Sequence, residues 1–65
     1  MDAYDKEKNI VLEFDEPAHY VDAENNVLRE KDVIRQNNII AHLHCEFWRF
    51  NAVTQKLWKV NNVKT

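Results

Sequence analysis

The chain has 65 residues, a formal net charge of −2, one cysteine and no glycine. A chain this short forms one domain, 1–65, and buries only ~60% of the surface that its unfolded form exposes, so its core must be small. A single cysteine excludes an internal disulfide and fits a reducing compartment. We therefore expect one small domain that is stabilised by self-association or by a metal.

The N-terminal segment 1–9 is charged and does not resemble a signal peptide. The apolar runs are far shorter than the ~20 residues that cross a membrane. These features predict a cytoplasmic protein without a membrane segment. We expect the ends of the chain, 1–8 and 62–65, to be frayed.

Charge is divided unevenly along the chain. Residues 1–32 carry ten acids and four bases, a net charge of −6, whereas residues 33–65 carry one acid and five bases, a net charge of +4. Separated charge of this kind steers partners and favours binding over catalysis.

Residues 10–15 show the period of a half-buried strand. Ile10, Leu12 and Phe14 form one row, which we expect to face the core, and the other row contains Glu13 and Asp15, which we expect to face solvent. Pro17 ends this strand because proline cannot donate a ladder hydrogen bond.

Residues 20–29 predict a hairpin that turns at Asn25 and Asn26. Asparagine tolerates a positive φ angle better than other residues except glycine, and the chain has no glycine. A two-residue loop would place Asp22 opposite Arg29, as a cross-strand pair of opposite charges.

The segment 39–50 can be interpreted as a strand or as part of a helix. As a strand it places Ala41, Leu43, Cys45 and Phe47 on one face, with Cys45 as a small core residue. As a helix over about 31–52 it places two series at heptad a and d spacing: Val33, Ile40 and Phe47, and Gln36, Leu43 and Phe50.

The β-branched and aromatic content favours the strand interpretation. The fold predicted is all-β, a small antiparallel meander of four or five strands that could curl into a barrel. The alternative is an α+β fold with one helix at about 31–52.

Residues 47–60 predict a C-terminal hairpin with a loop at 51–55. This segment begins with an aromatic residue, has a short turn containing Thr54 and carries Trp58 near its end. In these features it resembles the outer hairpin of a Kelch-type propeller blade, and the resemblance implies a hairpin. A loop centred on Val53 pairs Trp48 with Trp58. Aromatic residues at positions 47, 48 and 50 indicate a bulge, burial on two sides or an exposed aromatic patch.

The function expected first is that of a non-enzymatic interaction or inhibitor protein. A row of carboxylates on the first strands could imitate a phosphate backbone and block a nucleic-acid-binding protein with a basic surface. The residues expected to bind this partner are Glu13, Asp15, Glu16, Asp22 and Glu24.

The alternative function is direct binding of nucleic acid by the C-terminal hairpin, where aromatic rings could stack on bases and cations could neutralise phosphates. The residues expected there are Trp48, Arg49, Lys56, Trp58 and Lys59. The same aromatic surplus predicts a homodimer.

A weaker candidate is a metal site. His42, His44 and Glu46 would project from one strand face at positions i, i+2 and i+4, with His19 as a fourth ligand. We expect no catalytic residues and no cofactor, because the chain lacks a glycine-rich phosphate loop and is too short to enclose a pocket of ~300 Å³.

Overall fold

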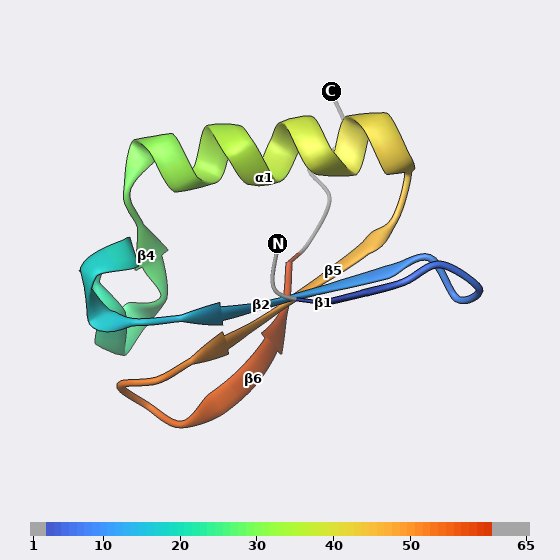
Figure 1. Cartoon of the computed structure of the whole chain (residues 1–65). Helices are drawn as coiled ribbons and strands as arrows, with labels where there is room; N and C mark the ends of the chain where they lie inside the picture. Colours follow the sequence, from blue (N-terminus) through green and yellow to red (C-terminus); the bar gives the residue numbers. More distant parts are fainter. Residues whose placement is uncertain (1–2, 61–65) are drawn as a thin grey trace.

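A computed structural model describes residues 3–60 of the chain (Figure 1). The strands in this range are β1 (Ala3–Asp5), β2 (Ile10–Asp15), β3 (Tyr20–Asp22), β4 (Val27–Leu28), β5 (Glu46–Asn51) and β6 (Lys56–Lys59). One α-helix, α1 (Glu30–Leu43), precedes β5, and two 3-10 turns, η1 (Pro17–His19) and η2 (Ala23–Asn25), flank β3.

Four of the strands form an open sheet in the order β1-β2-β5-β6, and β3 and β4 form a small separate hairpin. The central strands β2 and β5 are parallel, while β1 and β6 are antiparallel to their neighbours. A parallel pair needs a long crossover connection, and here the connection includes α1, which covers one face of the sheet (Figure 1). The fold is therefore two layers, a sheet and a helix.

The all-β meander is wrong and the α+β alternative with one helix is confirmed. The helix ends earlier than the expected boundary near residue 52, because residues 46–51 form β5. Both interpretations of residues 39–50 were partly correct, since the helical pattern holds to Leu43 and the strand alternation holds from Glu46. The sheet formed by the described strands is open and does not close into a barrel.

Local signals explain where α1 begins and ends. Its first turn carries Glu30 and Asp32, whose negative charges favour the positive end of the helix dipole. It ends at His44, which takes a left-handed φ of 52° in the position that glycine usually occupies. The side-chain amide of Asn9 donates to the carbonyls of Leu43 (2.8 Å) and His44 (3.1 Å), which satisfies acceptors at the helix end.

The two predicted hairpins exist, but the strand register of each differs from the predicted register. In the C-terminal hairpin Trp48 lies opposite Lys59, and Trp58 lies opposite Arg49. The loop is shorter than expected, because Asn51 pairs in the ladder and its carboxamide oxygen accepts two backbone N–H groups of the turn. A shift of one residue moves a side chain to the other face, so the tryptophans lie on opposite faces and not opposite each other.

In the hairpin of β3 and β4, Asn26 takes a positive φ of 57°, which confirms the expected role of asparagine. Asp22 pairs with Val27, however, and not with Arg29. The turn is longer than two residues because η2 lies within it. Arg29 instead donates from Nε to the carbonyl of Ala18 at 2.6 Å.

The strand at residues 10–15 is confirmed, but the assignment of its faces is reversed. Leu12 and Phe14 are exposed, whereas Glu13 and Asp15 lie on the buried face beneath α1. The apolar core lies on that same face and consists of Val11, Cys45, Phe47 and Val60. The expectation of an outward acidic row on this strand is therefore wrong.

Residues 3–5, which we expected to be frayed, pair with β2 as strand β1. The other segment expected to fray, 62–65, lies outside the described residues. Among residues 3–60, no helix is both long and apolar enough to cross a membrane.

Candidate functional site

The sheet face that points away from α1, called the open face below, carries a group of large apolar side chains. The strand register places them in two adjacent rows across β2, β5 and β6. They are Leu12, Phe14, Trp48, Phe50 and Leu57. Phe14 and Leu57 remain 53% and 54% exposed, so water contacts much of this group.

Two aromatic residues on the central strands of the open face, Phe14 and Phe50, pack against each other. Phe14 and Phe50 are opposite in the register of β2 and β5, and their rings stack with centroids 5.4 Å apart and planes 19° apart. Contacts of this kind restrict the motion of the two rings and add to the stability of the face.

The charge on the open face is low. Lys59 Nζ lies 3.1 Å from Glu46 Oε1, so the cation next to Trp48 is already paired. Asp5 lies opposite Ile10 in the register and therefore belongs to the same face. The open face thus has an apolar centre and a margin with a small net negative charge.

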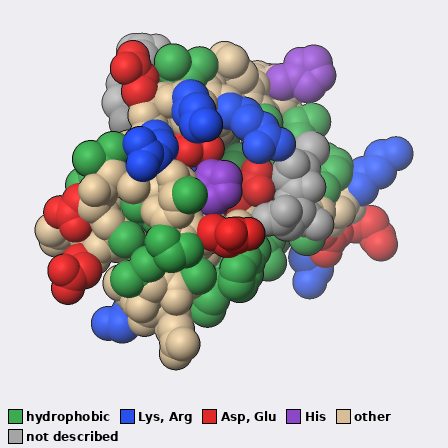
Figure 2. Space-filling view, turned by 60° about the vertical axis from the view of Figure 1, so that its left-hand side comes forward, with side chains coloured by type: hydrophobic (Ala, Val, Ile, Leu, Met, Phe, Trp, Pro, Cys, Tyr) green, Lys and Arg blue, Asp and Glu red, His purple; other side chains and the backbone are tan. Residues whose placement is uncertain are grey.

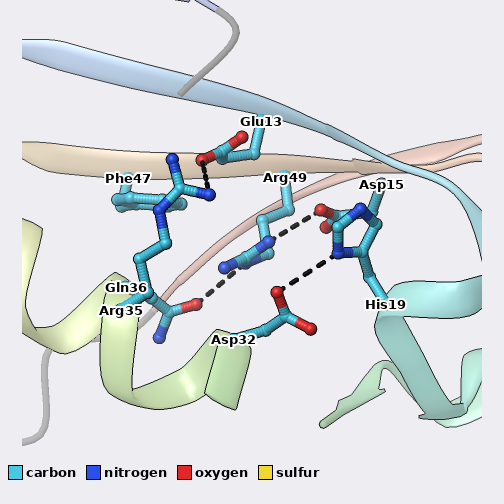
Figure 3. A pocket seen from close by; sticks show the side chains of 8 residues that line it. All are labelled: Glu13, Asp15, His19, Asp32, Arg35, Gln36, Phe47 and Arg49. Carbon is cyan, nitrogen blue, oxygen red and sulfur yellow. Dashed lines mark hydrogen bonds and ion pairs between the residues drawn. The ribbon is translucent and has the colours of Figure 1, made fainter.

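The opposite face contains a buried polar network beneath α1 (Figure 3). Arg49 Nη1 lies 2.7 Å from Asp15 Oδ1, and Arg49 Nε donates to Gln36 Oε1 at 2.8 Å. The second oxygen of Asp15 accepts the hydroxyl of Tyr20 at 2.9 Å. The side chains of Arg49 and Asp15 are only 5% and 2% exposed. Their ion pair joins β5 to β2 inside the molecule, and the hydrogen bond to Gln36 joins β5 to α1.

Beside this network lies a small cavity of about 10 Å³. His19 Nδ1 approaches Asp32 Oδ1 to 3.2 Å at its mouth, and Arg35 approaches Glu13 to 4.0 Å (Figure 3). The other oxygen of Asp32, Oδ2, is buried without a hydrogen-bond partner in the described part of the chain. A cavity of this size accommodates about one water molecule and is far smaller than a small-molecule site of ~300 Å³.

The hydroxyl of Tyr20 makes the stability of this network sensitive to alkaline pH. Burial raises the pKa of Tyr20 from 10.0 to about 12, a hydrogen bond from Trp58 opposes the rise, and Asp15 adds to it. Because the folded pKa exceeds the unfolded one, the stabilisation is complete below pH 10 and is lost as the pH rises towards about 12. We expect urea denaturation to show a falling free energy of unfolding across this range.

The variant Tyr20→Phe should lose most of that alkaline slope, because it has no phenolic proton to release. Tyr4→Phe is the control, since it removes an exposed hydroxyl that bonds to Asn9. Equal slopes for Tyr20→Phe and the wild type would contradict the assignment.

The acidic residues expected to bind a partner do not form one surface. Glu13 and Asp15 are buried and lie next to Arg35 and Arg49, whereas Glu16, Asp22 and Glu24 are exposed. Both of these cations come from the basic half of the sequence, so folding brings the opposite charges together. Figure 2 shows Lys and Arg side chains next to Asp and Glu side chains on one face of the molecule.

The aromatic and basic residues expected to bind nucleic acid are also divided between the faces. Trp48 and Lys59 lie on the open face. Arg49 is buried beneath α1, and Trp58 packs against the core on that side and donates to Tyr20. Lys56, opposite Asn51 at the start of β6, is exposed.

The candidate metal ligands are separated by the end of the helix. His42 lies in the last turn of α1, His44 caps it and Glu46 begins β5. Within residues 3–60, no group of three or more His, Cys, Asp or Glu side chains could hold a metal ion. Cys45 is a core residue, as expected, and burial raises the pKa of its thiol.

No protein-family model, curated protein or solved structure matches this chain. The candidate site therefore rests on geometry. Sequence reasoning did not identify Leu12, Phe14, Phe50 and Leu57 as surface residues. The signal that could have found them is the presence of aromatic residues on both faces of residues 47–50, for which an exposed patch was one of three interpretations.

Proposed function

We propose that this chain is a non-enzymatic protein-binding module and that the open face is its binding surface. The observation that supports this most strongly is the exposure of Leu12, Phe14 and Leu57 on one face of a sheet whose other face already holds the apolar core beneath α1. Folding normally removes apolar side chains from water. A sheet with apolar side chains on both faces gains free energy when another surface covers the exposed face.

The composition of the open face fits a polypeptide partner. Protein interfaces are enriched in aromatic side chains at the centre and have few charges there, as in the group around Phe14, Trp48 and Phe50. Single-stranded nucleic acid would need unpaired cations beside the aromatic rings. The cation next to these rings, Lys59, is paired with Glu46, and Arg49 is buried with Asp15.

Exposed acids remain available at Glu16, Asp22 and Glu24 for a partner with a basic rim. Asp22 and Glu24 lie outside the four-stranded sheet, and in this proposal the apolar face supplies most of the binding free energy. A complete imitation of a phosphate backbone would require Glu13 and Asp15 as well, and these are buried.

Site-specific photo-crosslinking in the cells that express the protein tests the proposal. The photoreactive residue p-benzoylphenylalanine replaces Phe14 on the open face in one variant and Ile34 on α1 in the control. Both positions are 53% exposed, so accessibility is matched. We expect discrete crosslinks to polypeptide from position 14, and their loss when Leu57→Glu is added.

Equal crosslinking from both positions would overturn the proposal, because the open face would then be no better a binding surface than the helix. Crosslinks from position 14 that disappear with nuclease would overturn it in favour of nucleic acid.

A further inference from the structure

Among residues 3–60, more apolar side chains are exposed than are fully buried. In the described part of the chain the buried ones are Val11, Tyr20, Cys45, Phe47 and Val60. The exposed ones are Tyr4, Leu12, Phe14, Val21, Val27, Ile34, Val53 and Leu57. A core this small contributes only a few kcal/mol in a chain of this length, and small domains without disulfides or metals are commonly stabilised by association.

We propose that the polypeptide which covers the open face is a second copy of this chain, so that two copies pack sheet against sheet as a symmetric dimer. This inference rests on the proposed function and names the partner of the same surface. Covering the exposed apolar side chains of this face stabilises the fold by mass action. Another copy of the chain is the one partner that is present wherever the chain is made.

The charge on the open face permits contact with itself. In a two-fold symmetric dimer each patch meets an identical patch, so a strongly charged face would repel its copy. The centre of the open face is apolar, and Glu46 and Lys59 neutralise each other at its margin. In the described part of the chain, Asp5 adds a negative charge outside that ion pair, and it lies opposite Ile10 at the far end of β2 from Phe14.

The area of the open face fits a weak dimer. The strands of three, six, six and four residues, at about 3.3 Å per residue and about 4.8 Å apart, cover a flat area of ~300 Å². Protruding aromatic side chains raise the accessible area, but two copies would bury less than about 1,200 Å², the size of weak and transient interfaces. We therefore expect a weak, reversible dimer with a dissociation constant in the micromolar range.

The edges of the sheet disfavour the other way in which two sheets can join. Edge strand β1 has three residues, and edge strand β6 carries Lys56 and Lys59, whose charges oppose pairing with another strand. Face-to-face packing uses the apolar rows, leaves Lys56 on the opposite face and keeps Lys59 at the margin in its ion pair with Glu46. Two sheets packed in this way lie about 10 Å apart, as in a β-sandwich.

Sedimentation equilibrium of the purified full chain tests the dimer. We expect the wild type to convert from monomer to dimer over roughly 1–300 μM, with a melting temperature that rises with concentration. Leu57→Glu should weaken self-association at least about tenfold, because it buries a charge in the interface. Ile34→Glu makes the same kind of change at a side chain of equal exposure on α1 and should associate like the wild type.

A second measurement does not depend on a variant that might be unstable. Amide spectra of the wild type, recorded on dilution across the same range, should change at β2, β5 and β6 and stay constant along the solvent side of α1. A chain that is monomeric throughout, with crosslinks from position 14 to a different polypeptide, would overturn the dimer and leave the proposed function standing. A dimer that is unaffected by Leu57→Glu would overturn the sheet-to-sheet dimer, and equal crosslinking from positions 14 and 34 would overturn the proposed function as well.

Discussion

Replacing Arg49 with methionine is expected to unfold most of the protein. Methionine keeps much of the arginine volume but leaves Asp15, 2% exposed, as a buried charge without its cation. Removing one partner of a buried ion pair costs about 3–5 kcal/mol, which matches the whole stability of a domain of this size. Circular dichroism and urea denaturation measure the loss.

The control for this variant is Lys59→Met, which breaks the ion pair with Glu46. Both of these side chains are about half exposed, and an exposed pair contributes at most about 1 kcal/mol. The double variant Asp15→Asn with Arg49→Met should be more stable than Arg49→Met alone, because it no longer buries an unpaired charge. Equal stability of Arg49→Met and Lys59→Met would contradict a buried ion pair between Arg49 and Asp15 beneath α1.

Replacing Phe47 with alanine is expected to destabilise the fold by about 3–5 kcal/mol. The ring is 1% exposed and lies in the core with Val11 and Cys45, so its removal leaves a cavity between the sheet and α1. The guanidinium of Arg49 lies 5.1 Å from the centre of this ring, so the substitution also removes a contact of the buried cation. Loss of the cooperative thermal transition is the expected observation.

Phe14→Ala is the matched control, because it deletes the same side chain from the opposite face of the sheet. Its ring is 53% exposed and loses a stacking contact with Phe50. We expect the isolated monomer to lose no more than about 1.5 kcal/mol, while self-association weakens. A larger loss for Phe14→Ala than for Phe47→Ala would show that the core lies on the other face.

The alternation of residues 10–15 predicts which side chains share a face of the strand, but not which face is buried. It correctly grouped Leu12 with Phe14 and Glu13 with Asp15, because successive side chains of a strand point to opposite faces. It could not identify which group α1 covers. That depends on Arg49, which is distant in sequence and binds Asp15 only after the chain has folded, and on Gln36 of α1, which accepts a hydrogen bond from Arg49.

The positions of the tryptophans illustrate a second limit. Two strands with a short loop between them were evident from residues 47–60, and the structure has β5 and β6 there. Whether Trp48 faces Trp58 depended on one residue of register, which the bonds of the Asn51 side chain to the turn decide. An error of one residue reverses every face in the hairpin.

The C-terminal end of the helix was not evident from the sequence, because residues 39–43 fit both the helical and the strand period. The signal that ends α1 is His44 in a left-handed conformation, and histidine is an unusual residue in that role. Its partner, Asn9, lies in the turn before β2 and binds the helix end through its carboxamide. No window of sequence around residue 44 contains that contact.

Sequence alone determined the small size of the core, the strand at residues 10–15, a strand near residues 56–60, a turn at Asn25 and Asn26 and the place of Cys45 in the core. These follow from local periodicity, backbone preference and composition. Only the tertiary structure decided that the charged row lies beneath the helix and the aromatic row faces outward. The physical reason is that a buried carboxylate such as Asp15 is tolerable only when Arg49, from a strand 34 residues away, supplies its counter-charge.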